Sequence, residues 1–330
     1  MKKLLSILLA LAMVFSLAAC GGTDGGKEDA DVIKIGVMQF GEFTALQNAF
    51  DGFKAGLEEA GFVDGQNIKI NYLSAAADTA NCPTIADTLI NDGSDLIFAI
   101  ATPSVSCIKE KTTDIPVLFT AVTDPVASGI LADANNPGGN ISGTSDMNPV
   151  AEQIDLLKEL LPESSVVAVM YCSSESNSAA QYELAKTELE KLGMQCIQKT
   201  VASIDEVKSA IESLNGLVDA IYIPTDNTLS DGMTLVAQTA NDIGIATIVG
   251  EPGQVENGGT ATFGIDYFEL GKQTAAMAVE ILNADNPIAA VGAMPVGYQT
   301  KECVTAINEA SIKALNLTVP QSILDRAIKY

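Results

Sequence analysis

The feature that most constrains this 330-residue chain is an internal repeat, because residues 32–128 and residues 165–255 carry the same order of segments. Each half opens with an apolar run, continues into a helical pattern that stops at a glycine, and then has two more apolar runs. The spacing between matching runs is nearly constant, which predicts one duplicated βαβαβ unit. The matching runs are Val32–Phe40 with Ser165–Cys172, Asp95–Pro103 with Asp219–Asp226, and Ile115–Phe119 with Ile245–Val249.

A duplicated unit of this kind predicts an α/β fold with two doubly wound, Rossmann-like lobes of equal size. Ligands of such sheets bind outside the carboxyl ends of the strands. Two lobes place two such edges opposite each other. The sequence therefore predicts a cleft for a small molecule between the lobes.

The first twenty residues are not expected to belong to that fold. Lys2 and Lys3 precede an apolar run, Leu4–Phe15, that is too short to span a bilayer, and no later segment is long and apolar enough to do so. The sequence LAAC then reads as a lipobox with Cys20 as the acylated residue, although an ordinary secretory peptide with a chance cysteine is the alternative. We expect a lipoprotein signal peptide at residues 1–19, a Gly-rich flexible tether at 20–31, and attachment to the membrane through lipid alone.

Composition excludes several partners and chemistries. The chain has 42 acidic and 18 basic residues and a net charge of −24, which repels nucleic acid. No helix-turn-helix segment precedes the lobes. The absence of histidine excludes Ser-His-Asp and Cys-His catalysis and most zinc sites. Arg326 is the only arginine and lies near the C-terminus, and there is no tryptophan. We expect no metal, no cofactor and no nucleic-acid partner.

Five cysteines follow Cys20, and an odd number leaves at least one thiol free. We interpret most of them as small buried apolar residues, and a disulfide between the first two remains open. They are Cys82, Cys107, Cys172, Cys196 and Cys303.

Two corners of the first lobe join a predicted strand to a predicted helix. At the first corner, Gln39 and Glu42 lie before the helix, Phe43 has no obvious core role and is a candidate to project into the cleft, and Thr44 with Gln47 forms a capping-box pattern. At the second corner, Thr102 stands at the N-cap position before Pro103. The hydroxyls of Thr102 and Ser104 either face the cleft or serve helix capping only.

The second lobe has two corresponding corners. A polar cluster follows Val166–Cys172, and Ser174, Glu175 and Asn177 are its candidate ligand contacts. Asp226 follows the next run and either caps a helix or receives a ligand ammonium. Three further corners complete the candidate site: Thr123-Asp124-Pro125, Gly250-Glu251-Pro252 and Asp266-Tyr267-Phe268, the last of which is a candidate to cross between lobes.

Taken together, these corners resemble the ABC-transporter substrate-binding lipoproteins of the tryptophan/tyrosine-type group. The resemblance covers Ile33 to about Leu317, nearly the whole mature chain. It departs at the first corner, where the family usually reads Glu-His-Pro-Ala-Leu-Asp and this chain has Glu42 to Gln47 as EFTALQ. The stretches that carry it are IFAIATP from Ile97, FTAVTDPV from Phe119, NISGTSDMNPV from Asn140, SESNS from Ser174, YIPTDN from Tyr222 and GIDYFELGKQT from Gly264.

The resemblance implies the type I periplasmic-binding-protein fold, with crossovers near Met147, Ile265 and Gly292. The N-terminal lobe would then comprise residues 32–147 plus 266–292, and the C-terminal lobe 148–265 plus 293–330. The implied ligand shell is Gln39, Glu42, Thr102, Ser104, Thr123, Asp124, Ser174, Glu175, Asn177, Asp226 and Asp266, and Phe43 joins it as an added phenyl at the pocket mouth.

The resemblance also implies an extracytoplasmic, lipid-anchored, monomeric component of an ABC importer, whose partner is a permease with a cytoplasmic ATPase. A zwitterion with an apolar side chain, an aromatic or large aliphatic amino acid, matches the residues at the corners best. A lipoprotein that presents a small molecule to a receptor is the alternative. An enzyme that uses carboxylates such as Glu42 and Asp226 is the more remote one, and we expect no catalysis.

Overall fold

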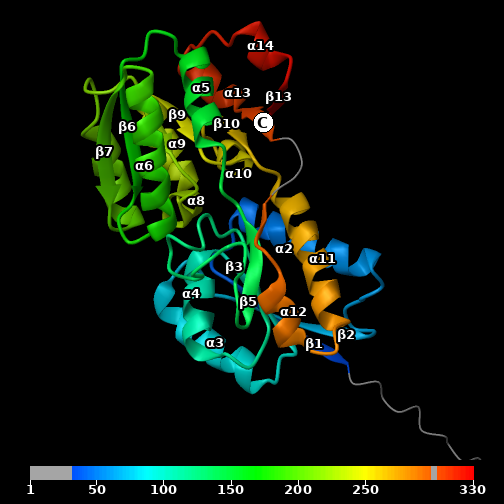
Figure 1. Cartoon of the computed structure of the whole chain (residues 1–330). Coiled ribbons are helices and arrows are strands. Elements are labelled where there is room, and N and C mark those ends of the chain that lie inside the picture. Colours follow the sequence, from blue (N-terminus) through cyan, green and yellow to red (C-terminus); the bar gives the residue numbers. More distant parts are fainter. Residues whose placement is uncertain (1–31, 299–302) are drawn as a thin grey trace, which may run out of the picture. The chain divides into compact units, whose positions relative to one another are not determined.

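The computed structural model describes residues 32–298 and 303–330, so the predicted signal peptide, Cys20 and the tether lie outside the described residues. The first sheet has six strands, all in parallel pairs, in the order β11-β5-β4-β3-β1-β2. Figure 1 shows it in the lower part of the view. Its strands are β1 Ile33–Gln39, β2 Ile68–Ser74, β3 Leu96–Ile100, β4 Val117–Thr120, β5 Ile141–Ser145 and β11 Gly297–Tyr298.

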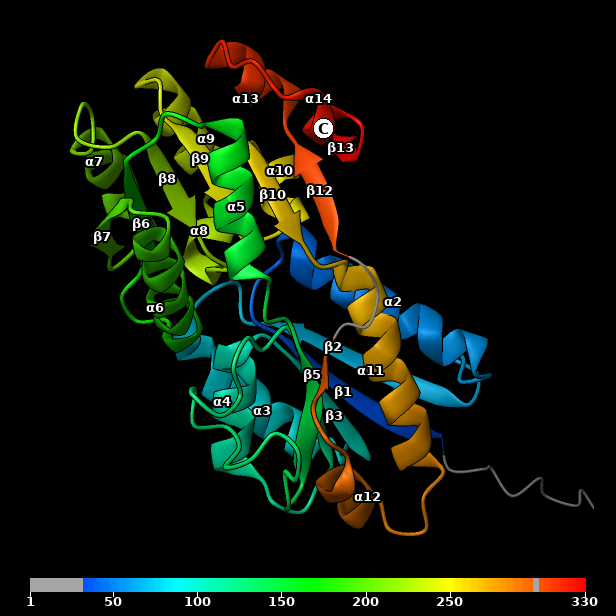
Figure 2. The same cartoon turned by 45° about the horizontal axis from the view of Figure 1, so that its top comes forward.

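Helices cover both faces of this sheet (Figures 1 and 2). On one face, α2 (Thr44–Glu59) packs against α11 (Tyr267–Leu282), which lies far from it in sequence. On the other face lie α3 (Cys82–Asn91) and α4 (Thr102–Lys111). The short helices η1 (Thr79–Asn81) and α12 (Pro287–Ala293) complete this part of the chain.

The second sheet has seven strands in the order β13-β12-β10-β9-β8-β6-β7, and β10 with β12 is its antiparallel pair. Its strands are β6 Val166–Cys172, β7 Gln195–Val201, β8 Ala220–Ile223, β9 Ala246–Val249, β10 Ala261–Gly264, β12 Val304–Ile307 and β13 Ala327–Lys329. Its helices are α5 Val150–Leu160, α6 Ser176–Lys191, η2 Ile204–Glu206, α7 Val207–Glu212, α8 Asn227–Asp231, α9 Met233–Asp242, α10 Pro252–Glu256, α13 Glu309–Ala314 and α14 Gln321–Leu324.

Alternate side chains of β6 explain why helices cover both faces of the second sheet. Val167 and Val169 are buried in one apolar cluster with residues of α5 and α6. Ala168 and Met170 are buried in another cluster with residues of α7 and α9. Successive side chains of a strand point to opposite faces, so a continuous apolar run needs a helix layer on each face.

The duplicated doubly wound fold predicted from the sequence is confirmed. Each predicted apolar run coincides with a strand to within two residues at its start and three at its end, and α2 and α6 end before Gly61 and Gly193. These two glycines have φ angles of 87° and 72°, in the left-handed region that favours glycine after a helix. The repeat therefore extends to the way in which the two helices end.

The chain passes between the sheets after β5, after β10 and after β11. The first two crossovers touch, because the side-chain oxygen of Asn148 accepts a hydrogen bond from the Ile265 amide at 3.1 Å. The third was expected near Gly292, but β11 pairs with β5 and so lies in the first sheet. A parallel strand there covers an edge of β5 that would otherwise be open. The lobe boundaries themselves stay a prediction.

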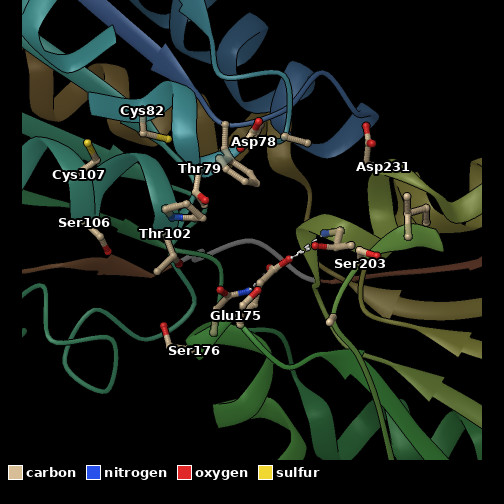
Figure 3. Close-up of a pocket in the computed structure, with 18 of the residues that line it drawn as sticks. Asp78, Thr79, Cys82, Thr102, Ser106, Cys107, Glu175, Ser176, Ser203 and Asp231 are labelled. Atoms are coloured by element: carbon tan, nitrogen blue, oxygen red, sulfur yellow. Dashed lines mark hydrogen bonds between the residues drawn. The ribbon is translucent and has the colours of Figure 1, made fainter. Parts of the chain in front are cut away.

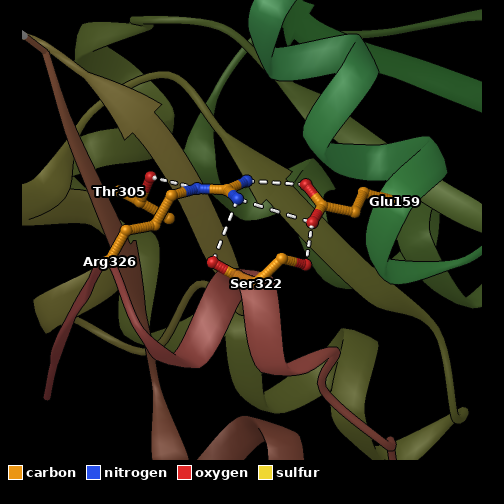
Figure 4. Close-up of polar contacts among 4 residues, drawn as sticks. All are labelled: Glu159, Thr305, Ser322 and Arg326. Carbon is orange, nitrogen blue, oxygen red and sulfur yellow. Dashed lines mark hydrogen bonds and ion pairs between the residues drawn. The ribbon is translucent and has the colours of Figure 1, made fainter.

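Arg326 forms an ion pair that links the C-terminal segment to α5 (Figure 4). Its Nη2 lies 2.6 Å from Glu159 Oε2, and its Nε donates to Thr305 Oγ1 at 3.2 Å. Ser322 donates to the same carboxylate, and these contacts lower the pKa of Glu159. The arginine thus has a structural role away from the cleft. Within residues 32–298 and 303–330, no helix has the length and apolar character needed to cross a membrane.

Candidate functional site

Two cavities lie where the carboxyl ends of the two sets of strands meet. The larger cavity has a volume of about 720 Å³, within the range of small-molecule sites. Figure 3 shows that Thr102, Cys82 and Cys107 from α3 and α4 border it on one side, and Glu175, Ser203 and Asp231 from the second lobe on the other. Apolar surface comes from Phe40, Ala77, Pro83, Pro103 and Ile204. The predicted interlobe cleft is therefore present in the structure.

The smaller cavity has a volume of about 20 Å³ and shares Asn177 with the larger one. A single water molecule needs about 10–15 Å³ of such volume, so this space fits one group of that size. Its wall includes three acids and two aromatic rings. The lining residues are Phe43, Ala45, Leu46, Ala121, Thr123, Asp146, Asn177, Thr225, Asp226, Asn227, Ser230, Glu251 and Tyr267.

Glu175 organises the second-lobe side of the larger cavity. Its Oε2 accepts hydrogen bonds from the backbone and side-chain nitrogens of Asn227, at 2.9 and 2.7 Å. Its Oε1 accepts from the backbone nitrogen and the hydroxyl of Thr228, each at 2.8 Å. Both carboxylate oxygens are thus occupied by the first residues of α8. Glu175 positions the loop after β6 rather than offering an open acceptor.

Asp226 is 1% exposed and lies at the N-cap of α8. Its Oδ1 accepts from the Leu229 amide at 2.9 Å, and its Oδ2 accepts from the Cys172 amide at 2.7 Å. Burial, with the charge of Glu175 as a second cause, raises the pKa of Asp226 to about 8. Of the two roles that the sequence left open, the structure shows the helix cap. Neither oxygen lacks a donor.

Asp146 directly follows β5 and is 4% exposed. The Tyr267 hydroxyl donates to its Oδ2 at 2.6 Å, whereas its Oδ1 has no hydrogen-bond partner. Burial raises the pKa of this carboxyl, and the neighbouring hydroxyls of Tyr267 and Thr123 lower it by a smaller amount. Sequence reasoning did not select Asp146 as a site residue. The available signal was its place in SGTSDMNP, immediately after a strand, which is the rule that selected the other corners.

Glu251 is the third acid of the smaller cavity and caps α10. Its Oε2 accepts from the Gly253 amide at 2.5 Å, and its Oε1 from the Gln254 amide at 2.8 Å. Burial raises the pKa of Glu251 to about 7. Among the residues that line the two cavities, there is no lysine or arginine. These acids therefore face no basic side chain in the cavity walls.

The structure brings seven of the twelve predicted contact residues to the cavities. Phe43, Thr123 and Asp226 line the smaller cavity, Thr102, Ser174 and Glu175 line the larger one, and Asn177 lines both. Gln39, Glu42, Ser104, Asp124 and Asp266 line neither.

These five residues are placed differently from one another. Glu42 is exposed, Asp124 accepts from the amides of its own turn, and Asp266 caps α11. Gln39 and Ser104 are buried, and Gln39 Oε1 and Ser104 Oγ have no partner.

Both predicted caps of the first lobe are wrong. Helix α2 begins at Thr44, with Phe43 at the N-cap and no capping side chain. The Thr44 hydroxyl instead accepts from the Asn257 side chain of the other lobe, at 3.1 Å. Helix α4 begins at Thr102 itself, and its N-cap is Ala101, with a φ angle of 79°.

The thiols of Cys82 and Cys107 are free. Both border the larger cavity. Burial raises the pKa of Cys82 to about 11 and also raises that of Cys107. Of the two states left open by the sequence, the structure shows unpaired cysteines.

Comparison with known proteins gives a consistent result. Residues 34–330 match the family model described as ABC transporter substrate binding protein. The chain is 37% identical over 338 residues to the tyrosine-binding protein of Clostridioides difficile strain R20291, covering all of this chain and 96% of that protein. The match to the family model supports a transport component over a sensing lipoprotein.

Two solved structures extend this similarity to three dimensions. A domain from Streptococcus pneumoniae in complex with L-Trp is 33% identical, with a TM-score of 0.82, covering 89% of this chain and 99% of that one. A ligand-free, open substrate-binding protein with adhesive properties from Clostridium difficile is 39% identical, with a TM-score of 0.69, covering 90% and 99%. The chain therefore belongs to the family of ABC-transporter substrate-binding proteins, as its corners indicated, and is an extracytoplasmic solute-binding component.

Proposed function

We propose that this protein captures an aromatic amino acid, as a zwitterion, in the interlobe cleft and presents it to an ABC permease with a cytoplasmic ATPase. The relatives' names support the ligand class, since one is a tyrosine-binding protein and another is described in complex with L-Trp.

The observation that carries the proposal is the chemistry of the cavity walls. They contain acids without a lysine or arginine, which suits a ligand that brings its own cation. Phe40, Pro83 and Pro103 add apolar surface for a ring. The start of α4, at Thr102, offers unpaired backbone N–H groups and the positive end of a helix dipole to the ligand carboxylate.

A ligand panel on the purified protein tests this proposal. The panel contains L-tyrosine, L-tryptophan, L-phenylalanine, L-leucine, glucose and adenosine, and the readout is the melting temperature. A ligand that binds only the folded state stabilises it by about 2.7 kcal/mol at a hundredfold excess over its Kd. We expect the aromatic amino acids to raise the melting temperature by several degrees. A shift from glucose or adenosine with none from any amino acid contradicts the proposal.

We also propose that the mature protein is a monomer anchored through diacylglyceryl-Cys20, a residue outside the described range. The LAAC sequence and the Gly-rich stretch after it support this anchor. The Cys20→Ala variant should be released from the membrane or remain unprocessed in cell fractionation, while Cys196→Ala, on β7, serves as the matched control. A Cys20→Ala protein that is still processed and membrane-bound rules out the anchor.

A further inference from the structure

The described residues contain three buried side-chain polar atoms without a hydrogen-bond partner, and all three belong to the carboxyl edge of the first sheet. They are Gln39 Oε1 at the end of β1, Ser104 Oγ in the helix after β3, and Asp146 Oδ1 directly after β5. A buried polar group without a partner is unfavourable, and such groups in a native structure require an explanation. All three lie at the edge of the sheet where ligands of doubly wound folds bind.

Asp146 differs from the other two because it lines the smaller cavity and is a carboxylate. The other buried carboxylates of the cleft already have donors on both oxygens. Asp226 has the amides of Cys172 and Leu229, and Glu251 has those of Gly253 and Gln254. Glu175 is likewise occupied on both oxygens. Asp146 Oδ1 is therefore the acceptor of this group that lacks a donor.

The size of the smaller cavity limits what can bind beside Asp146. Its volume of about 20 Å³ holds one group of the size of a water molecule, which an ammonium matches and an aromatic ring does not. No lysine or arginine lines the cavity. Asn177 lines both cavities, so a ligand can place its ammonium in the smaller one and its ring in the larger one.

From this geometry we infer that Asp146 is the residue that binds the α-ammonium group of the ligand, through Oδ1, while Tyr267 holds the other oxygen. This inference rests on the proposed function and identifies which group selects the amino-acid class. Asp146 follows the first crossover strand and Tyr267 begins the helix after the second. The ligand's positive charge is thus bound at the place where the chain passes between lobes.

Calorimetric titration with two pairs of ligands tests the inference. Each pair is an amino acid and its analogue without the amine: L-tyrosine with 3-(4-hydroxyphenyl)propionate, and L-tryptophan with indole-3-propionate. A hydrogen bond to a charged group contributes enough to change affinity about tenfold to a hundredfold. In the parent protein, we expect each amino acid to bind at least about tenfold tighter than its analogue.

The Asp146→Asn variant should lose about tenfold to a hundredfold in affinity for the amino acids and little for the analogues. Asp95→Asn is the matched control, because Asp95 is an exposed carboxylate at the opposite end of the same sheet. If Asp146→Asn does not fold, Tyr267→Phe takes its place. That variant removes the donor to Asp146 Oδ2. It should also reduce the ratio between the affinity for each amino acid and the affinity for its analogue.

Three results overturn the inference. Asp146→Asn, or Tyr267→Phe in its place, could leave the preference for the amine unchanged. Asp226→Asn could instead lose affinity for the amino acids, while Asp146→Asn binds them as tightly as the parent. Finally, if the parent binds neither amino acid, the proposed function fails together with the inference. The first two results leave the proposed function intact, so the two failures are distinguishable.

Discussion

At the residue scale, the unusual feature is a group of buried acids that face no basic side chain in the cavity walls. Burial is the main cause of the raised pKa of Asp226, to about 8, and of Glu251, to about 7, and it also raises that of Asp146. In an unfolded chain these carboxyls have pKa values of about 4. At pH values between the unfolded and the folded pKa, the folded protein therefore binds more protons than the unfolded chain.

This difference fixes the sign of the pH dependence. Stability falls with rising pH wherever the folded state binds more protons, so we expect the melting temperature to fall as pH rises from about 5 to 8. Glu159 and Asp219 have lowered pKa values, so their contribution to the stability of the folded state is present within this window and is lost only at lower pH. Melting curves across the window measure the slope, and Glu251→Gln should make it shallower. A melting temperature that rises steadily from pH 5 to 8 contradicts this account.

At the element scale, the contact of α2 with α11 depends on glycines. A Cβ atom added to Gly271 would lie 2.0 Å from the Ala49 carbonyl oxygen, and one added to Gly52 would lie 1.9 Å from that of Phe268. The two helix backbones are therefore too close for any side chain at these positions. Because α11 follows the second crossover, this packing attaches residues Tyr267–Leu282 to the first lobe.

Replacing Gly271 by alanine tests this packing. Alanine favours a helix over glycine by about 1 kcal/mol, but overpacking commonly costs about 1–3 kcal/mol or more. Since the obstructing atom belongs to the backbone of α2, we expect overpacking to dominate and Gly271→Ala to lower the free energy of unfolding. Glu58→Ala, at an exposed position of α2, is the control and should change it by less than about 0.5 kcal/mol. Equal stability of Gly271→Ala and the parent would show that the helices can separate freely.

The elements that sequence predicted well are those of the repeat. Its apolar runs located β1, β3 and β4 and their counterparts β6, β8 and β9, because fully buried parallel strands form long apolar runs. The short β11 lies outside the repeat, so the third crossover was expected too early. The predicted cap at Thr44 was wrong for a different reason, because the Thr44 hydroxyl accepts a hydrogen bond from Asn257 of the other lobe.

The site was predictable in outline only. Strand ends led to Thr102, Thr123, Asn177 and Asp226, because the rule for doubly wound sheets needs only the order of segments. Asp146 obeys the same rule, but its importance depends on Tyr267, which lies 121 residues away in sequence and occupies one of its oxygens. The open oxygen that distinguishes it from Asp226 cannot be read from the sequence.

At the scale of the whole molecule, the crossovers suggest that the lobes move as units. Residues 146–149 and 265–266, where the chain leaves one sheet for a helix of the other lobe, are short connections, and hinges of this kind absorb domain closure. We expect an aromatic amino acid to reduce the radius of gyration measured by small-angle X-ray scattering, without a change in helix content by circular dichroism. Asp146→Asn should need more ligand for the same decrease. Identical scattering of the parent with and without saturating ligand would exclude closure.

The central claim is that the cleft of this substrate-binding protein selects an aromatic amino acid through its ammonium group at Asp146. A crystal structure of the protein in complex with L-tyrosine or L-tryptophan tests it most directly. The account predicts the amine nitrogen within about 2.7–3.2 Å of Asp146 Oδ1, with the aromatic ring in the larger cavity. An amine held by Asp226 or Glu251 instead, or a ligand bound outside the two cavities, would contradict it.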